Sequence, residues 1–460
     1  MVVASKWMTL SAMTVLCLTL FALWQFLPHP AVIVVLCFLP FALLFVLRFS
    51  FWLVMFFVLF SFFRIHEALP ALYSLKIPLL LSLGALSALL WHAIITRKLE
   101  MYWHPAFTWL SVFWALVIFG AVTSSNPGIA IEYIKNIYWK IIIMTFAVAW
   151  LLDNEEAVKH FSIWIVIAGT LIAIVAISNS LSGVGLVEGT RVTIGRHLGS
   201  VLGDPNDLSL VLMFPLAFAV SLATAKEIGP LRYFAFGAML LTMWAVIATQ
   251  SRGGLLGSLA VFGIFGLKMI RSKTLLITLG VVAMLVLFAL AGVSDRQSGG
   301  AAEEGIDASA MGRLYAWEAA FKMALDNPLT GVGLNNFFPN YFFYSSHWDG
   351  VNHAVHSTWF GVLAETGFLG LIVFCGIIVK LILTSRGALA ILDKPECDCS
   401  AYLRATTFAT YAGLVGTIVS GTFLTQGFTW PLYILASICI ATAKLSQNYS
   451  QIENTDKDQT

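Results

Sequence analysis

His356 lies where a polar stretch of the chain enters a long apolar segment, within the sequence HAVHSTWFGVLAETG that begins at His353. A histidine at a membrane boundary can act as a general base near neutral pH, because its usual pKa is about 6.5. His353 could be the base instead, or it could support His356. Glu365 lies nine residues beyond His356, inside the apolar segment. The alternative is an interfacial histidine that only caps or anchors its helix.

Four arginines lie in polar stretches or at the ends of apolar segments: Arg191, Arg196, Arg252 and Arg313. The planar guanidinium group suits bidentate binding of phosphate oxygens. An arginine between two apolar segments, as at Arg252, is costly unless it is paired or faces a wet cavity. Snorkelling to the interface is the alternative. Arg313 could instead pair with Glu318 or Glu304.

Two lysines, Lys135 and Lys140, lie inside an apolar segment, in the sequence EYIKNIYWK. Charged side chains within membrane segments usually face a cavity or a partner. Both lysines are therefore candidates for contact with a substrate. Glu132 lies one turn before Lys135 and could neutralise that lysine instead.

Composition identifies the environment in which these residues act. The chain of 460 residues is 59% hydrophobic and 11% charged, whereas soluble domains carry about 25% charged residues. A spanning helix needs about 20 apolar residues. The sequence predicts fourteen apolar segments, near residues 7–27, 31–47, 49–63, 73–96, 105–123, 128–151, 161–182, 207–225, 231–250, 253–270, 274–293, 357–384, 402–425 and 428–446. Several neighbours are nearly continuous, so we expect an all-α, polytopic membrane protein with 12–14 transmembrane helices and an even number of spans.

The placement of Lys and Arg predicts the orientation, because cytoplasmic loops carry an excess of both. A cytoplasmic N-terminus puts 16 of these residues inside and 8 outside, which also places the C-terminus in the cytoplasm. The outside set is Arg64, Lys76, Arg191, Arg196, Arg252, Arg296, Arg313 and Lys322. Positive charge on the outer face opposes the topological rule, so the six arginines in this set indicate a function there.

Two outer-face loops divide the chain. The expected organisation is an N-terminal transmembrane bundle at 1–293 that contains an outer-face loop at 183–206, a large outer-face loop at 294–356, C-terminal transmembrane helices at 357–446, and a cytoplasmic tail at 447–460. Asp204 or Asn206 is expected to cap the helix that follows the first loop. The second loop should contain a helix from Met311 to Leu325, with Leu314, Trp317, Ala320, Phe321 and Ala324 on one face. Residues 297–310 are rich in Gly, Ala and Glu, and we expect them to be mobile.

Several catalytic motifs are absent from the sequence. It has no Walker A motif, no dinucleotide-binding fingerprint and no H-E-x-x-H. The outer face also lacks the D-x-D pair of a metal-dependent nucleotide-sugar transferase. We therefore expect no metal and no cofactor. Outer-face arginines with a histidine indicate chemistry on a lipid-borne phosphate donor, because cations can stabilise a pyrophosphate leaving group.

The C-terminal half resembles the O-antigen ligase and O-antigen polymerase superfamily. The matching pieces occur in the family's order and cover roughly residues 190–370. They are Asp204-Pro205-Asn206 after a loop arginine, Thr-Gln-Ser-Arg-Gly-Gly at 249–254, Arg313 with Trp317, Asp-Asn-Pro-Leu-Thr-Gly-Val-Gly-Leu-Asn-Asn-Phe at 326–337, and His356-Ser followed by Leu363-x-Glu365-x-Gly367. One departure is Ser357, because the family usually has asparagine after its histidine.

The resemblance implies a GT-C-like membrane glycosyltransferase that acts at the periplasmic face of the bacterial inner membrane. Its donor would be a glycan on undecaprenyl pyrophosphate. In the ligase branch, which we favour, the acceptor is the lipid A-core of lipopolysaccharide, and neither metal nor nucleotide takes part. Most family members have about twelve spanning helices.

On this interpretation His356 takes the proton from an acceptor hydroxyl. Arg191, Arg252 and Arg313 hold the donor pyrophosphate. Direct attack at the anomeric carbon predicts inversion. Further candidates for binding the pyrophosphate or the glycan are Arg196, Lys135, Lys140, His353 and Glu365, although Glu365 could orient the segment around His356 instead.

Two alternatives keep the donor and change the acceptor. An O-antigen polymerase extends another lipid-linked glycan, and a protein O-oligosaccharyltransferase modifies serine or threonine. A transporter of lipid-linked glycans is an alternative from another class. It predicts charges deep in several helices near the midplane, whereas only Glu132, Lys135, Lys140 and Glu365 run deeper here.

Overall fold

The computed structural model describes residues 44–290 and 308–458, with a few isolated positions before residue 44. The predicted segment at 7–27, most of the segment at 31–47, and residues 297–307 of the stretch expected to be mobile lie outside the described residues. Every regular element named in the described part of the chain is a helix, which confirms the all-α prediction.

The α-helices are, in chain order, α3 (Ser50–Phe63), α4 (Ile65–Ala68), α5 (Pro70–Tyr73), α6 (Ile77–Leu90), α7 (Pro105–Val122), α8 (Pro127–Tyr133), α9 (Trp139–Leu151), α10 (Glu155–Ser182), α11 (Pro205–Thr224), α12 (Leu231–Ala248), α13 (Arg252–Met269), α14 (Lys273–Leu290), α15 (Ala308–Asp326), α16 (Phe337–Tyr344), α17 (Thr358–Leu392), α18 (Ala401–Gly421) and α19 (Trp430–Asp458). Two π-helical turns, η1 (Trp91–Ile95) and η2 (Ile134–Tyr138), continue α6 and join α8 to α9. Short 3-10 turns are η3 (Arg196–Leu198), η4 (Val201–Gly203) and η5 (Lys226–Ile228).

Nine helices within the described residues are long and apolar enough to cross a membrane. Their bounds follow the predicted apolar segments closely, as in α7 and α12, because hydropathy over about 20 residues reports membrane spans directly. The chain is a multi-pass membrane protein. The last helix, α19, continues from the C-terminal apolar segment through residues 447–458 of the expected tail.

Local signals in the sequence explain where the helices begin. Proline occupies the first position of α7, α8 and α11, where its missing N–H leaves no hydrogen bond unmade. Polar side chains just before several helices accept hydrogen bonds from the first turn, namely Asn126, Asn154, Asp204, Ser251, Ser357 and Ser400. Three of these caps, at α11, α13 and α17, face the site described below.

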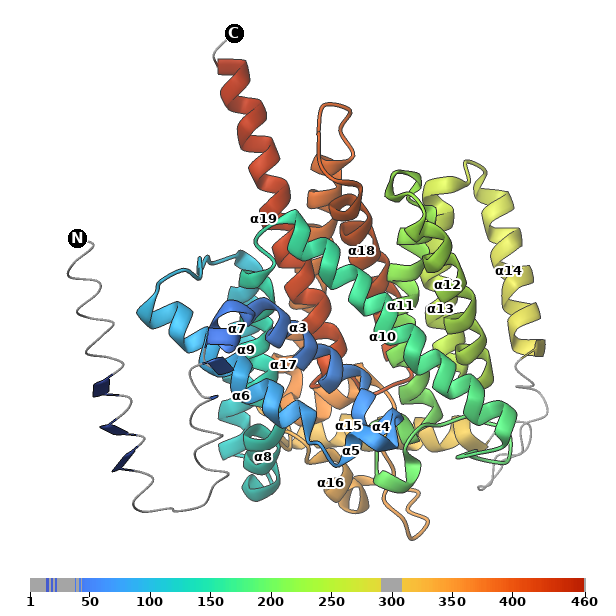
Figure 1. The fold of residues 1–460 in the computed structure, drawn as a ribbon. Coiled ribbons are helices and arrows are strands. Elements are labelled where there is room, and N and C mark those ends of the chain that lie inside the picture. Colours follow the sequence, from blue (N-terminus) through green and yellow to red (C-terminus); the bar gives the residue numbers. More distant parts are fainter. Residues whose placement is uncertain are drawn as a thin grey trace.

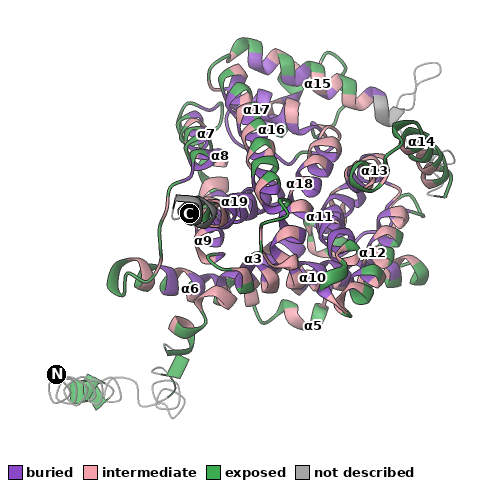
Figure 2. Ribbon diagram, turned by 90° about the horizontal axis from the view of Figure 1, so that it is seen from above, coloured by how far each residue is buried: buried purple, intermediate pink, exposed green. Residues whose placement is uncertain are grey.

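The centre of the molecule is α11, in which 17 of the 20 residues are buried. It packs against α10, α12, α13 and α18. Figure 2 shows the buried residues concentrated around α11, α18 and α19, while α14 lies at the margin and is mostly exposed. Exposed apolar side chains on the outer helices fit a lipid environment, in which they need no protein partner.

Small residues bring α13 close to α18. A Cβ atom placed on Gly257 would lie 3.0 Å from the carbonyl oxygen of Gly416, and one placed on Gly416 would lie 3.1 Å from the carbonyl oxygen of Gly257. Such small-residue crossings are common between membrane helices because they let the backbones approach. The crossing fixes the start of α13 relative to the end of α18, and both ends reach the same face of the protein.

Figure 1 shows that α4, α5, α8, α15 and α16 gather at one end of the bundle, opposite the C-terminus. We call this end the site face. Helix α15 lies across it and packs against α17. The expected apolar face of α15 is only partly correct. Trp317, Ala320 and Ala324 pack inward, but Leu314 and Phe321 are 48% and 45% exposed, because Ala316, Ala319 and Met323 complete the buried face instead.

The segment after α15 is attached to the turn between α7 and α8. The Ser125 N–H donates to the carbonyl oxygen of Val332 over 3.0 Å, and the Asn340 side chain donates to the Ser125 hydroxyl over 2.7 Å. Gly333 has a φ of +94°, and a Cβ there would lie 2.0 Å from the Cβ of Ser124. This close approach requires glycine at position 333.

We predict that Gly333→Ala lowers the melting temperature of the detergent-solubilised protein, because the added methyl group collides with Ser124. Overpacking of this kind typically costs about 1–3 kcal/mol. Gly350→Ala is the matched control, because Gly350 has a similar φ of +99° but nothing within 4 Å of an added Cβ. An equal fall in the melting temperature of the two variants would show that only the positive φ angle matters, contrary to this prediction.

Candidate active site

His356 stands immediately before the N-terminus of α17. Its φ is +44°, a left-handed conformation that is uncommon for residues other than glycine. Ser357 is buried and caps α17 by accepting the N–H of Phe360. Asparagine is an equally good capping residue, so the cap explains how serine can replace the asparagine usual in the family. The cap fixes the backbone from which the half-buried His356 side chain projects.

Burial is the main cause that holds the pKa of His356 below its usual value, followed by the positive charge of Arg313. His353 and Arg191 act in the same direction, while the carboxylate of Asp204 opposes them. These four groups come from three separate segments of the chain, so the fold brings their charges to one histidine. At neutral pH the imidazole is therefore uncharged and able to accept a proton.

Helix α15 positions the residue before His356. The indole N–H of Trp317 donates to the carbonyl oxygen of Val355 over 3.1 Å. The Trp317 ring also stacks on Phe360, with 5.0 Å between centroids and an interplanar angle of 10°. Trp317 thus contacts the chain on both sides of His356, which explains why a tryptophan follows Arg313 by one helical turn.

Phe423 links Arg313 to the start of α13. The guanidinium carbon of Arg313 lies 6.0 Å from the centroid of the Phe423 ring, within the range of a cation–π contact. A Cβ placed on Gly253 would lie 3.1 Å from the Cβ of Phe423. Arg252, the half-buried first residue of α13, therefore lies next to the loop that carries Phe423.

Arg191 is only 3% exposed and bonds to protein groups. Its Nε–H donates to the carbonyl oxygen of Thr249 over 3.1 Å, and Nη2 donates to Oδ1 of Asn206 over 2.9 Å. The hydroxyl of Ser251 donates to the same Asn206 oxygen over 3.0 Å. This buried network joins the loop at 183–206, the start of α11 and the start of α13.

The loop between α18 and α19 closes the site from another side. The Thr358 hydroxyl donates to the carbonyl oxygen of Leu424 and accepts the N–H of Gln426. The Gln426 side chain then donates to Oδ1 of Asp207 over 3.2 Å. The start of α17 is thereby bonded, through one loop, to the start of α11.

Glu365 organises backbone near His356. Its carboxylate accepts the N–H groups of Asn335 and Phe337 over 2.9 and 3.3 Å. The helix breaks two residues later at Gly367, which has a φ of +69°, and the Phe368 N–H donates to the carbonyl oxygen of Pro328. These bonds hold the segment at 326–337 against α17, so Glu365 supports the alternative role of orienting the surroundings of His356.

Among the described residues, four of the seven non-glycine residues with positive φ lie in the segments that build this site. Besides His356, three non-glycine residues in the segments described above have positive φ: Glu188, Gln250 and Asn335. Conformations of this kind cost about 1–3 kcal/mol each and concentrate at functional sites. Their position at the site face therefore adds to the case that these segments are held for chemistry.

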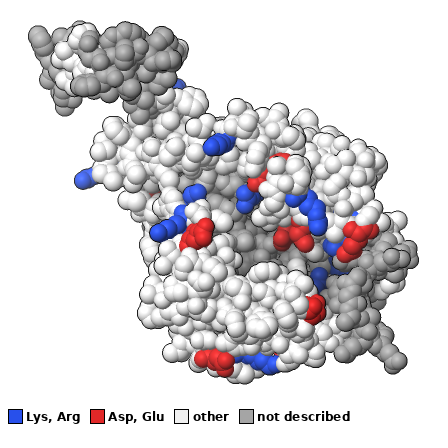
Figure 3. Space-filling view, turned by 90° about the horizontal axis from the view of Figure 1, so that it is seen from below, with Lys and Arg blue, Asp and Glu red and all other residues white. Residues whose placement is uncertain are grey.

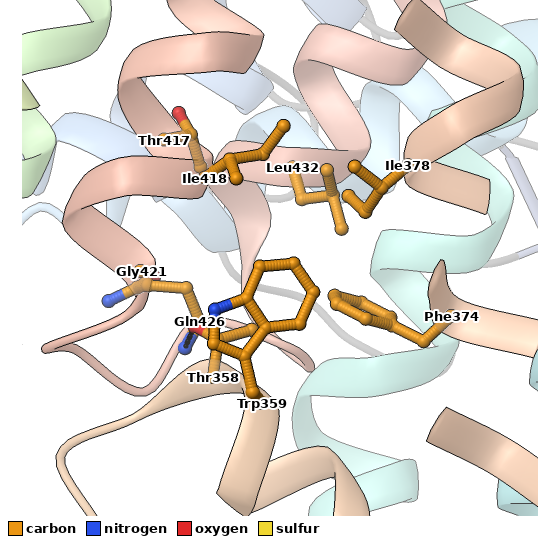
Figure 4. A pocket seen from close by; sticks show the side chains of 9 residues that line it. All are labelled: Thr358, Trp359, Phe374, Ile378, Thr417, Ile418, Gly421, Gln426 and Leu432. Carbon is orange, nitrogen blue, oxygen red and sulfur yellow. Dashed lines mark hydrogen bonds between the residues drawn. The ribbon is translucent and has the colours of Figure 1, made fainter. Parts of the chain in front are cut away.

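Figure 3 views the site face directly, and charged side chains of both signs gather there around a central hollow, with mostly uncharged surface elsewhere. A separate small cavity lies at the start of α17, between Thr358, Trp359, Phe374 and Gln426 (Figure 4). Its volume of about 20 Å³ is enough for one water molecule and far too small for a sugar. This small cavity is therefore not a binding site for a substrate of that size.

The structure brings together only some of the residues that sequence analysis selected. Arg191, Arg313 and His353 each lower the pKa of His356. Arg252 lies beside the loop between α18 and α19 that carries Phe423. His353 is itself bonded to Asp349, with Nε2 2.9 Å from Oδ2. Arg196 is exposed and donates to the carbonyl oxygen of Gly203.

Neither of the two lysines is among the charges that act on His356. Lys135 is exposed, and Lys140 lines a cavity with Arg64 and His66. The part of the chain that the structure describes contains no group of three His, Cys, Asp or Glu residues arranged to hold a metal ion.

Sequence reasoning missed several residues that build the site. Asp204 was expected only as a cap; it does cap α11, and its charge also reaches His356. The predicted segments at 402–425 and 428–446 include most of the loop TFLTQGFTW, among them Phe423, and leave only Gln426 and Gly427 between them. Its polar residues between two apolar segments were the available signal, because a polar interruption at a helix end often lines a site.

These features define a polytopic α-helical membrane protein in which one face gathers arginines around an uncharged histidine. The family model described as O-antigen ligase matches residues 237–375. This match confirms the resemblance at the level of the O-antigen ligase and polymerase superfamily, whose members are glycosyltransferase-like enzymes. Arg252, Arg313 and His356 lie within the matched residues, and Arg191 precedes them. No curated protein matches the chain.

We predict that Asn206→Leu destabilises the protein by about 1–3 kcal/mol, because the buried Arg191 and Ser251 donors lose their shared acceptor. Asn206→Asp keeps an oxygen at the shared acceptor position and should melt close to the wild type. Thermal unfolding of the purified proteins measures the difference. An Asn206→Leu protein as stable as the wild type would show that this network contributes nothing.

Proposed function

We propose that this protein is an O-antigen ligase that transfers a glycan from undecaprenyl pyrophosphate to the lipid A-core of lipopolysaccharide. The reaction takes place at the site face, which we assign to the periplasmic side of the inner membrane, with both termini in the cytoplasm. The excess of Lys and Arg in the loops at the opposite end of the bundle, where the C-terminus lies, supports this orientation. The feature that supports the function most strongly is His356 at the start of α17, where burial and the charges of Arg313 and Arg191 lower its pKa.

In the proposed reaction His356 takes the proton from an acceptor sugar hydroxyl. The hydroxyl oxygen attacks the anomeric carbon of the donor glycan, and the bond from that carbon to the phosphate oxygen breaks. The electron pair leaves with undecaprenyl pyrophosphate, so the anomeric configuration inverts. Asp204 lies close enough to stabilise the imidazolium that forms, because its charge raises the pKa of His356.

Arg252 and Arg313 are assigned to the pyrophosphate, where fixed cations stabilise the charge that develops on the leaving group. Neither a metal nor a nucleotide takes part in this proposal. Arg191 is buried and bonded to Asn206 and Thr249, so we assign it a positioning role that adds positive potential to the site. Glu365 and Trp317 hold the two backbone segments between which the acceptor hydroxyl must reach His356.

Transfer by purified protein tests the proposal, with defined lipid-linked donor and three separate acceptors. We expect the lipid A-core acceptor to be glycosylated, in preference to a second lipid-linked glycan or a serine-containing peptide. His356→Ala should lower the rate roughly 10²–10⁴-fold, as loss of a general base does.

Three results would contradict this assignment. Wild-type activity in His356→Ala would remove the base. Loss of wild-type activity with chelators would contradict a metal-free reaction. Product formed only on another acceptor would place the protein in a different branch of the superfamily.

The pH dependence of transfer gives a second prediction. The base must be neutral, so kcat/KM should fall only as the pH drops through the lowered pKa of His356, below about 6.5. Arg313 is one of the causes of that lowering. Arg313→Gln should therefore raise the pKa of His356 and move the acid limb of the profile to higher pH.

Lys322→Gln is the matched control for the pH profile. Lys322 lies on the same helix but pairs with Glu318 over 2.6 Å, and it should leave the acid limb unchanged. An acid limb at the same pH in the wild type and Arg313→Gln would show either that His356 is not the titrating group or that Arg313 does not act on it.

A further inference from the structure

Two neighbouring cavities, of about 210 and 200 Å³, lie beside the site. They share four lining residues: Ser61, Arg64, Ile137 and Trp430. The first extends to His66 and Lys140. The second extends to Asp207 and Gln426, the pair that joins α11 to the loop packed on α17. The cavities therefore connect Lys140 with Gln426, whose N–H donates to the hydroxyl of Thr358, two residues after His356.

Lys140 has no carboxylate partner in the part of the chain that the structure describes. Its ammonium group lies 5.9 Å from the centroid of the Trp139 ring. Lys140 also belongs to a candidate membrane span, at residues 127–151. A cation at such a position is costly unless it faces water or an anion, so its presence on a cavity wall indicates a ligand.

Arg64 and His66 approach the same cavity from the end of α3. Nη1 of Arg64 lies 3.1 Å from Oε1 of Glu67, and Nε2 of His66 lies 3.5 Å from the same oxygen. Nδ1 of His66 is buried and has no hydrogen-bond partner. Burial lowers the pKa of His66, so its ring adds an unpartnered polar atom to the cavity wall and not a positive charge.

The position of this cavity decides which anion it can hold. The donor pyrophosphate is bonded directly to the carbon that reacts, so it must lie next to the base. The cations that act on His356 are Arg313 and Arg191, together with His353. Arg64 and Lys140 are not among the cations that act on His356. An anion bound between Arg64 and Lys140 would therefore belong to a part of a substrate that is distant from the reacting bond. The apolar walls, which include Phe57, suit an amphiphile.

We propose that Arg64 and Lys140 form a second anion-binding site, which holds a phosphate group carried by the acceptor glycolipid. This inference rests on the proposed function. The second cavity, past Asp207 and Gln426, is the route by which the rest of the acceptor reaches His356. The two lipid-linked substrates thus bind their phosphates at separate groups of cations on one face.

Steady-state transfer by the full-length protein tests this site. In Lys140→Gln we expect KM for a phosphorylated lipid A-core acceptor to rise roughly tenfold, because a charge-assisted hydrogen bond is lost. The KM for the donor and the value of kcat should not change. Lys140→Arg should restore the wild-type KM. Lys76→Gln is the control, because Lys76 is exposed just before α6 and does not line the cavity.

Removing the phosphate groups of the acceptor enzymatically should raise KM for the wild type to the level of Lys140→Gln. The same treatment should have no further effect on Lys140→Gln. A rise confined to the donor KM, or an equal sensitivity of both proteins to dephosphorylation, would overturn the proposal.

Direct binding separates this inference from the proposed function. The phosphorylated acceptor, added without donor, should bind wild type roughly tenfold more tightly than Lys140→Gln, whether or not transfer is observed. A wild type that fails to transfer but keeps this difference would refute the ligase function alone. Equal binding by the two proteins, with Lys140→Gln melting like the wild type, would refute the anion site.

Discussion

A buried arginine determines how the site face is assembled. The Arg191 guanidinium bonds the carbonyl oxygen of Thr249 and the side chain of Asn206, and Ser251 completes the network from the start of α13. A charge with this degree of burial is stable only when its donors are satisfied. The loop at 183–206, α11 and α13 must therefore meet in one arrangement. The capped starts of these helices then direct Asp204 and Arg252 toward the same face.

The second half of the site is built on α17. Ser357 caps the helix, Trp317 binds the carbonyl before His356, and Glu365 accepts two backbone N–H groups from the segment at 326–337. The loop after α18 joins this half to the first through Thr358, Gln426 and Asp207. Both halves are thus held by hydrogen bonds made mainly to backbone groups at helix ends. Such bonds define the position of His356 while leaving its side chain able to accept a proton.

This assembly separates two groups of cations from each other. Arg313 and Arg191 influence His356, whereas Arg64 and Lys140 share a cavity beyond Asp207 and Gln426. A bisubstrate enzyme that binds two anionic lipids benefits from such a division, because each phosphate group finds its own cations. The donor is then held where charge develops, and the acceptor is held where it can reach the base. The cations on the outer face that oppose the topological rule have a physical use under this proposal.

The sequence by itself determined the membrane spans and the helix starts. Hydropathy, prolines at first helical positions and capping side chains such as Asp204 act over a few residues, so they can be read locally. It also singled out His356 and the unusual outer arginines.

Only the tertiary structure decided which of those residues meet. Arg191 and Arg196 are five residues apart, yet one is buried in a network and the other is exposed. Lys140 lines the same cavity as Arg64, which is 76 residues earlier in the chain. The buried face of α15 includes alanines, whereas Leu314 is exposed. These outcomes depend on the packing of α10 to α13 and of α15 on α17, which brings together residues far apart in sequence and leaves no trace in local periodicity.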